Sequence, residues 1–153
     1  MFPNVFETTL ADYQGTLLAT VGEGPGPVFP PTNIIRNDEQ WNIKVDWEIH
    51  GMGVSFLPGQ FHIRVFLESI GTGPEFNLPV RFVDTTSAPL VTPPGPVPQR
   101  IYTQNIAILL GAIPAGVYKI VTVIHLFQDM TNTLPYPIAG FVEGGMVYVF
   151  NPA

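Results

Sequence analysis

The chain has 153 residues, which suits a single domain, and 46% of them are hydrophobic, which is enough for a sizeable core. Charged residues make up only 12% of the chain, against roughly 25% in a typical soluble domain. There are six Lys plus Arg residues, and the net charge is −6. The clustered basic residues that bind nucleic acid or anionic membranes are absent, so we expect no nucleic-acid partner.

Cysteine is absent, which excludes disulfides, thiolate metal sites and cysteine nucleophiles. The first ten residues, MFPNVFETTL, lack the basic and apolar regions of a secretory signal. We therefore expect no signal peptide and a cytoplasmic or non-classically exported protein. The longest apolar stretch, IAILLGAIPAGVY, is too short for a bilayer and is interrupted by Pro114, so we expect no membrane span.

The N-terminal segment, residues 1–35, is rich in apolar residues that need burial. Two pieces of it, NVFETTL and GTLLATV, are predicted strands that can pair. The Pro/Gly-rich linker GEGPGPVFPP reaches about 30 Å when extended at roughly 3 Å per residue. We predict that residues 1–35 form an extension that serves as an assembly arm. Residues 1–21, which include Phe2 and Phe6, are then expected to pair with or pack against another copy.

Prolines and glycines punctuate the rest of the chain and leave no window for an amphipathic helix. In WNIKVDWEIHG, apolar residues from Trp41 to Ile49 alternate strictly with polar ones, which predicts a strand with one buried face. QFHIRVFLESIG is the next predicted strand, and its Phe61 side faces the core. Shorter strands are predicted at NLPVRFV, RIYTQNIAILL and GGMVYVF, with an extended loop at APLVTPPGPVPQ.

The strand GVYKIVTVIHLF begins with a motif of known structural meaning. Its start, AGVY (Ala115, Gly116, Val117 and Tyr118), resembles the tyrosine corner that opens strand F of immunoglobulin-like and fibronectin-like sandwiches. The Cys…Trp…Cys core of antibody domains is missing, and Ile120 stands where the second cysteine would be. With the strand count, the resemblance implies an all-β fold. That fold is a single antiparallel Ig-like β-sandwich of about seven strands over residues 36–153, plus the N-terminal extension. The resemblance carries no function with it.

The same strand is apolar on both faces, which raises the question of what covers the second one. In the implied fold it is the antiparallel neighbour of QFHIRVFLE, and Tyr118 faces the core. The predicted register places four pairs opposite each other on the outer side: Glu68 with Lys119, Phe66 with Val121, Arg64 with Val123, and His62 with His125. Four apolar residues then form a patch outside the sandwich, which marks an interaction site; they are Phe66, Val121, Val123 and Phe127. The N-terminal segment, a second copy or another partner can cover it, and a loop covers that face if the strand parity is wrong.

No catalytic motif is present, and we expect neither an enzyme nor a cofactor. His62 and His125 invite a metal, but a third ligand is missing, so we expect two solvated strand histidines and no metal site. Asp46 and Glu48 fit the polar half of an alternating strand better than a glycosidase pair. The Gly-rich stretch GEGPGP lacks the lysine and hydroxyl residues of a phosphate loop.

Aromatic residues leave open a sugar-binding alternative. Trp41 and Trp47 fall on the apolar face of their strand and are expected in the core. The remaining possible platforms are Tyr13, Tyr102, Tyr136 and Tyr148. We therefore expect a non-enzymatic structural protein that self-assembles as a filament, shell or closed homo-oligomer, through the outer sheet face and the N-terminal arm. The alternative is a binding module that recognises carbohydrate or a partner protein.

Overall fold

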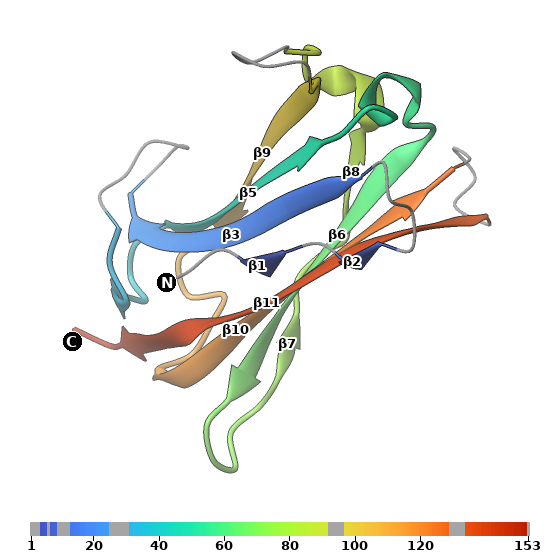
Figure 1. Cartoon of the computed structure of the whole chain (residues 1–153). Coiled ribbons are helices and arrows are strands. Elements are labelled where there is room, and N and C mark those ends of the chain that lie inside the picture. The colour runs from blue at the N-terminus through green and yellow to red at the C-terminus, as the bar shows by residue number, and fades with distance from the viewer. Residues whose placement is uncertain are drawn as a thin grey trace.

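In the computed structural model, the chain forms two β-sheets that pack on one another (Figure 1). The structure describes residues 4–5, 7–8, 13–24, 31–91, 97–128 and 134–152. One sheet has the strand order β1-β3-β5-β9, and the other has the order β2-β11-β10-β6-β7. In the second sheet, β4 lies parallel to β11 and β8 lies antiparallel to β6. The all-β, mainly antiparallel architecture predicted from the sequence is confirmed.

The strand bounds follow the sequence patterns closely in the middle of the chain. The strands are β1 (Asn4–Val5), β2 (Glu7–Thr8), β3 (Gln14–Glu23), β4 (Ile34–Arg36), β5 (Trp41–His50), β6 (Gln60–Ser69), β7 (Phe76–Asn77), β8 (Arg81–Asp84), β9 (Gln99–Ile108), β10 (Gly116–Phe127) and β11 (Pro135–Phe150). Two short 3₁₀ turns, η1 (Val54–Phe56) and η2 (Thr85–Ser87), are the helical elements of the described residues.

The core lies between the two sheets, where the strict alternation of β5 places its apolar face. Every second residue of β5 from Trp41 to Ile49 is buried, as predicted. The Trp47 ring stacks on Tyr102 of β9, with ring centroids 5.2 Å apart, and meets the edge of Phe61 of β6 at 5.6 Å. Aromatic contacts therefore join the two sheets through the centre of the sandwich.

The parity and the register of β10 are those that the sequence predicts. The side chains at Tyr118, Ile120, Thr122, Ile124 and Leu126 are buried. All four predicted outer pairs between β6 and β10 lie opposite one another. One detail differs: the Lys119 amine forms its ion pair with Glu143 of β11, at 2.9 Å, rather than with Glu68.

A local hydrogen bond fixes the turn that leads into β10. The Tyr118 hydroxyl donates to the carbonyl oxygen of Pro114 at 2.8 Å, so the ring reaches back over the turn. Gly116 lies under this ring, where a Cβ atom would come within 3.3 Å of it. A glycine at this position therefore suits the close approach.

The N-terminal segment pairs with its own chain, which corrects the prediction of an exchanged arm. β3 pairs along its whole length with β5, β1 pairs with β3, and β2 pairs with β11. The prediction that residues 1–21 pair with another copy is wrong for these strands, because Leu17 and Ala19 of β3 are buried in the core of the same sandwich. Phe2 and Phe6 lie outside the described residues.

Two strands differ from the sequence prediction in extent. The predicted strand NLPVRFV is divided into β7 and β8, and the interruption contains Pro79, which cannot donate to a ladder. β11 begins at Pro135, nine residues before the predicted strand GGMVYVF. Its first half contains residues that usually mark turns, but prolines and glycines are tolerated at sheet edges and bulges.

The buried Tyr102 makes alkaline unfolding a test of the core. Its hydroxyl donates to the Thr85 carbonyl at 2.6 Å, and burial raises the pKa of Tyr102 to about 12. The folded state therefore holds this proton more tightly than the unfolded chain, whose tyrosines ionise near pH 10, as is usual. Because the folded-state pKa is raised, its contribution to stability is complete below about pH 10 and is lost as the pH rises toward about 12.

We expect the free energy of unfolding of the wild type to fall more steeply between about pH 10 and 12 than that of Tyr102→Phe. Urea unfolding followed by circular dichroism measures both slopes. Equal slopes for the two proteins would show that Tyr102 does not hold its proton in this way.

Candidate functional site

The outer face of the second sheet is the candidate site, and three levels of paired residues build it. At the middle level, Val121 of β10 lies between Phe66 of β6 and Glu143 of β11. One level on each side, Lys119 lies between Glu68 and Met146, and Val123 lies between Arg64 and Phe141. We use the term outer face for these nine residues together with their neighbours on the same side, which are Ile34, His62, Phe82, His125, Phe127 and Tyr148.

The four predicted patch residues all lie on this outer face. Phe66, Val123 and Phe127 are partly buried, whereas Val121 is only 6% exposed within the single chain. Val121 therefore forms the floor of the face, and the exposed surface there belongs mainly to its neighbours.

Sequence reasoning missed the more exposed part of the face. Five large apolar side chains on it are each 50–58% exposed: Ile34, Phe82, Phe141, Met146 and Tyr148. Three of them belong to β11, and Phe141 lies in the half of that strand that the sequence does not reveal. Alternation alone places Met146 and Tyr148 on one face and Phe141 on the other, and Phe141 joins them because the register shifts between Glu143 and Met146.

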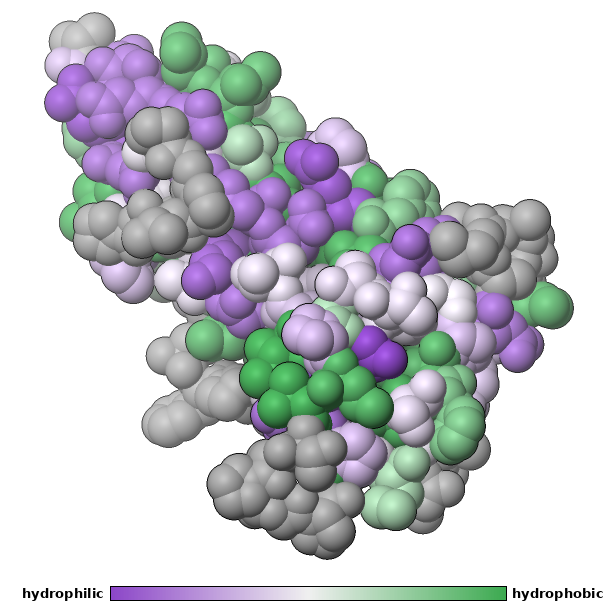
Figure 2. All heavy atoms as spheres, turned by 90° about the horizontal axis from the view of Figure 1, so that it is seen from above, coloured by the Kyte–Doolittle hydropathy of each residue, from purple (hydrophilic) through white to green (hydrophobic). Residues whose placement is uncertain are grey.

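The opposite outer face, on β3, β5 and β9, is mostly polar. Asp46 lies 4.0 Å from Lys44, and Glu48 contacts His50, so both carboxylates have local partners. This agrees with the prediction that Asp46 and Glu48 belong to the solvent-facing side of an alternating strand. The space-filling view shows that hydrophilic and hydrophobic residues gather in separate regions of the surface it displays (Figure 2).

The charges on the three central strands of the outer face balance. Arg64 and Lys119 oppose Glu68 and Glu143, two positive against two negative, although the chain as a whole carries −6. Lys119 and Glu143 neutralise each other, whereas Arg64 and Glu68 are exposed and form no ion pair with any residue that the structure describes. Two complementary charges on this face thus have no ion-pair partner in the described part of the chain.

The two histidines of the outer face pack with phenylalanines. His62 is only 6% exposed. Its ring centroid lies 4.7 Å from that of Phe82, in an edge-to-face contact, and 4.1 Å from that of Phe127. His125 contacts Phe127 at 4.8 Å. The expectation of two solvated histidines is wrong for His62, because these rings cover it. Within the described ranges, no group of three or more His, Asp or Glu side chains is placed to hold a metal.

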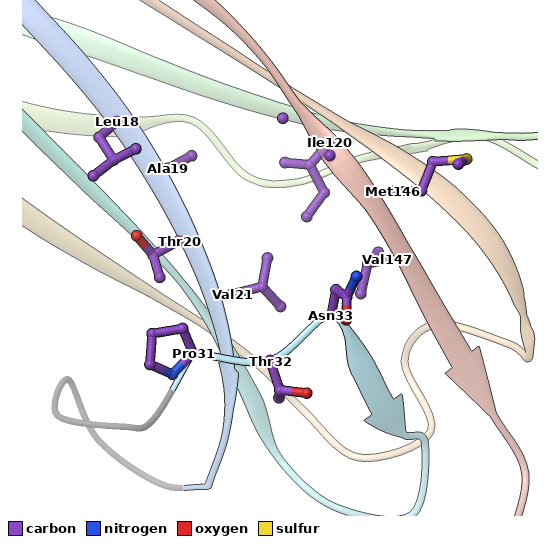
Figure 3. A pocket seen from close by; sticks show the side chains of 12 residues that line it. Leu18, Ala19, Thr20, Val21, Pro31, Thr32, Asn33, Ile120, Met146 and Val147 are labelled. Carbon is purple, nitrogen blue, oxygen red and sulfur yellow. The ribbon is translucent and has the colours of Figure 1, made fainter. Parts of the chain in front are cut away.

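A groove opens at the side of the sandwich, between the edges of the two sheets (Figure 3). Residues 18–21 of β3 and 144–147 of β11 form its walls, residues 31–33 border it, and Ile120 reaches it from the core side. Its volume is about 480 Å³, within the usual range of small-ligand sites of roughly 300–1,000 Å³. The described residues of the lining carry neither charged nor aromatic side chains and so offer no stacking platform for a sugar.

The aromatic residues considered for sugar binding are mostly unsuited to it. Trp41, Trp47, Tyr13 and Tyr102 are buried, as the core assignment of the two tryptophans predicts. Tyr148 is 51% exposed, but it lies on the outer face beside other apolar residues.

Comparison of the chain with protein-family models, with curated proteins and with solved structures finds no match. The described part of the chain contains no helix with the length and apolar character needed to cross a bilayer.

Proposed function

We propose that this chain is a non-enzymatic structural protein with an Ig-like sandwich, and that it self-associates through the outer face of the second sheet. The observation that carries the proposal is the set of five half-exposed apolar side chains gathered on one sheet face. A monomer gains nothing from exposing them, whereas burial against a partner stabilises by about 25 cal/mol per Å² of apolar area.

Two features of the described strands support the Ig-like part of this proposal. β3, β5 and β9 lie in one sheet and β11, β10 and β6 in the other, as expected for an Ig-like strand order. The Tyr118–Pro114 hydrogen bond has the form of a tyrosine corner.

The chemistry of the face favours protein as its partner. Lys119 and Glu143 form an ion pair within the chain, and the charges on the three central strands sum to zero. Aromatic residues, methionine and arginine, all of which this face carries, are enriched at protein interfaces. Because β3 belongs to its own sandwich, the proposal rests on the outer face and no longer on an exchanged arm.

Phe141→Glu is expected to shift the protein from an assembled particle to the monomer. Phe141 is 50% exposed in the single chain, so the fold should tolerate the change, whereas a carboxylate in a dry interface is costly. Size-exclusion chromatography with circular dichroism measures particle size and fold together.

Ile101→Glu is the matched control, because Ile101 is 57% exposed on the opposite, polar outer face. It should leave the particle size unchanged. If Phe141→Glu keeps the wild-type size, or if both variants lose it, the outer face is not the contact.

The groove favours a second candidate function, that of a module that binds a peptide. Among described strands, β2 pairs with β11 at residues 138–139 and β4 pairs with it at residues 148–150, so the edge between them has no strand partner. An unpaired edge beside an apolar groove is suited to strand addition by an extended peptide. Native mass spectrometry of the purified protein tests this candidate: a co-purified peptide supports it, and bare chain masses alone contradict it.

A further inference from the structure

The outer face is complementary to itself, and this property points to a specific partner. We infer that the face binds the same face of a second copy about a two-fold axis. This axis runs across the strands at the level of Phe66 and Val121. The inference rests on the proposed function and adds to it the identity of the partner, the symmetry and the residue pairs.

The register of the three strands supplies the geometry. The middle level holds Phe66, Val121 and Glu143, and on β6 and β10 the two flanking levels lie at equal distances along the strands. A two-fold axis along the middle level exchanges the flanking levels and reverses the strand direction. It therefore brings Glu68 opposite Arg64 of the second copy and, by symmetry, Arg64 opposite Glu68. This is the reciprocal pattern of an isologous interface.

This arrangement forms two pairs of opposite charges. Glu143, at the middle level, comes opposite Glu143 of the second copy, but each of these carboxylates is paired with Lys119 of its own chain at 2.9 Å. Arg64 and Glu68 are both exposed and have no ion-pair partner among the described residues of their own chain. Packed sheets lie about 10 Å apart, a gap that an arginine and a glutamate can close together from opposite sides. An arginine–carboxylate pair can form two parallel hydrogen bonds, which adds orientation to the contact.

The same two-fold rotation also brings apolar side chains of the two copies together. On β11, Met146 comes opposite Phe141 of the second copy, and sulfur–aromatic contacts of this kind are favourable. On β10, Lys119 comes opposite Val123, so its aliphatic stem can cover the valine while its amine stays with Glu143.

The other in-plane axis, parallel to the strands, gives a poor interface. It would place Glu68 against Met146 of the second copy and Arg64 against Phe141. The two charges without an ion-pair partner among the described residues would then be buried against apolar side chains. A strongly charged partner is also disfavoured, because the central face carries no net charge to attract it.

Charge reversal at the two unpaired positions tests the inference. Arg64→Glu alone places a new carboxylate opposite Glu68 twice in each dimer, and Glu68→Arg alone places arginines opposite each other twice. Each variant should dimerise at least about tenfold more weakly than the wild type, which corresponds to about 1.4 kcal/mol. Sedimentation velocity over a concentration series measures the dissociation constant, and circular dichroism verifies the fold.

An equimolar mixture of the two variants gives the decisive result. In the mixed dimer every like-charge contact becomes an opposite-charge contact, so the mixture should regain dimers near the wild-type affinity. The double variant Arg64→Glu/Glu68→Arg should regain them as well, because both of its pairs are again complementary. Lys44→Glu on the opposite face is the control, and it should leave dimerisation unchanged.

The outcomes separate the inference from the proposed function. If the wild type is monomeric at all concentrations, both fail. If the wild type associates but the mixture shows no rescue, self-association stands and the two-fold arrangement is overturned.

Discussion

Trp47→Ala is expected to lower the free energy of unfolding by about 3–5 kcal/mol, a large part of the total stability of a domain of this size. Trp47 is 2% exposed and is held between Tyr102 of β9 and Phe61 of β6. Removing the indole leaves a cavity at the point where the two sheets meet, and the rings around it lose their stacking partner. Urea unfolding followed by circular dichroism measures the change.

Ile101→Ala is the matched control, because this side chain is 57% exposed at the outer surface of the same sheet. It should change the free energy of unfolding by less than about 0.5 kcal/mol. If Trp47→Ala costs less than about 1 kcal/mol, the indole does not join the sheets as the structure has it.

Gly59→Ala is expected to destabilise the fold by more than about 3 kcal/mol, the second large effect. Gly59 precedes β6 with φ of +67°, and a Cβ atom there would lie 1.8 Å from the carbonyl oxygen of Phe127. The contact is with backbone, so no side-chain rotation can relieve it. The clash must separate the start of β6 from the end of β10, two strands that pair with Gln60 opposite Phe127.

Gly111→Ala separates the clash from the cost of the left-handed backbone. Gly111 has φ of +73°, but an added Cβ meets nothing within 4 Å. The substitution should therefore cost only about 1–2 kcal/mol, which is the penalty of the left-handed conformation for alanine. Thermal unfolding of both variants compares them, and equal losses would show that the close approach at Gly59 is not tight.

The sequence predicts the centre of the sandwich well because two independent constraints coincide there. Strict alternation shows which residues of β5 face the core, and the tyrosine at the corner shows which residues of β10 do so. One opposite-charge pair then suffices to choose the register with β6, which is confirmed in full. A slip by one residue would turn the apolar residues of a strand to the wrong side, so the register is strongly determined.

The N-terminal segment could not be placed from sequence, because apolar content alone does not say which chain buries it. Leu17 fills the core of its own sandwich, a position that an exchanged strand from a second copy would fill equally well. The burial of His62 escaped prediction for a different reason. It depends on the cross-strand neighbour Phe82 of β8 and the diagonal neighbour Phe127 of β10, and pairing with β8 was not predicted.

Oxidation of Met146, followed by mass spectrometry as the protein concentration is raised, tests the central claim most directly. Met146 lies on the outer face and is 58% exposed, while Met52 follows the end of β5 and is 64% exposed, which provides an internal reference in the same molecule. Self-association through the outer face predicts that oxidation of Met146 by dilute peroxide slows severalfold as the concentration rises, while that of Met52 stays constant. A Met146 oxidation rate that, like that of Met52, stays the same at every protein concentration would contradict the claim that the outer face binds a second copy.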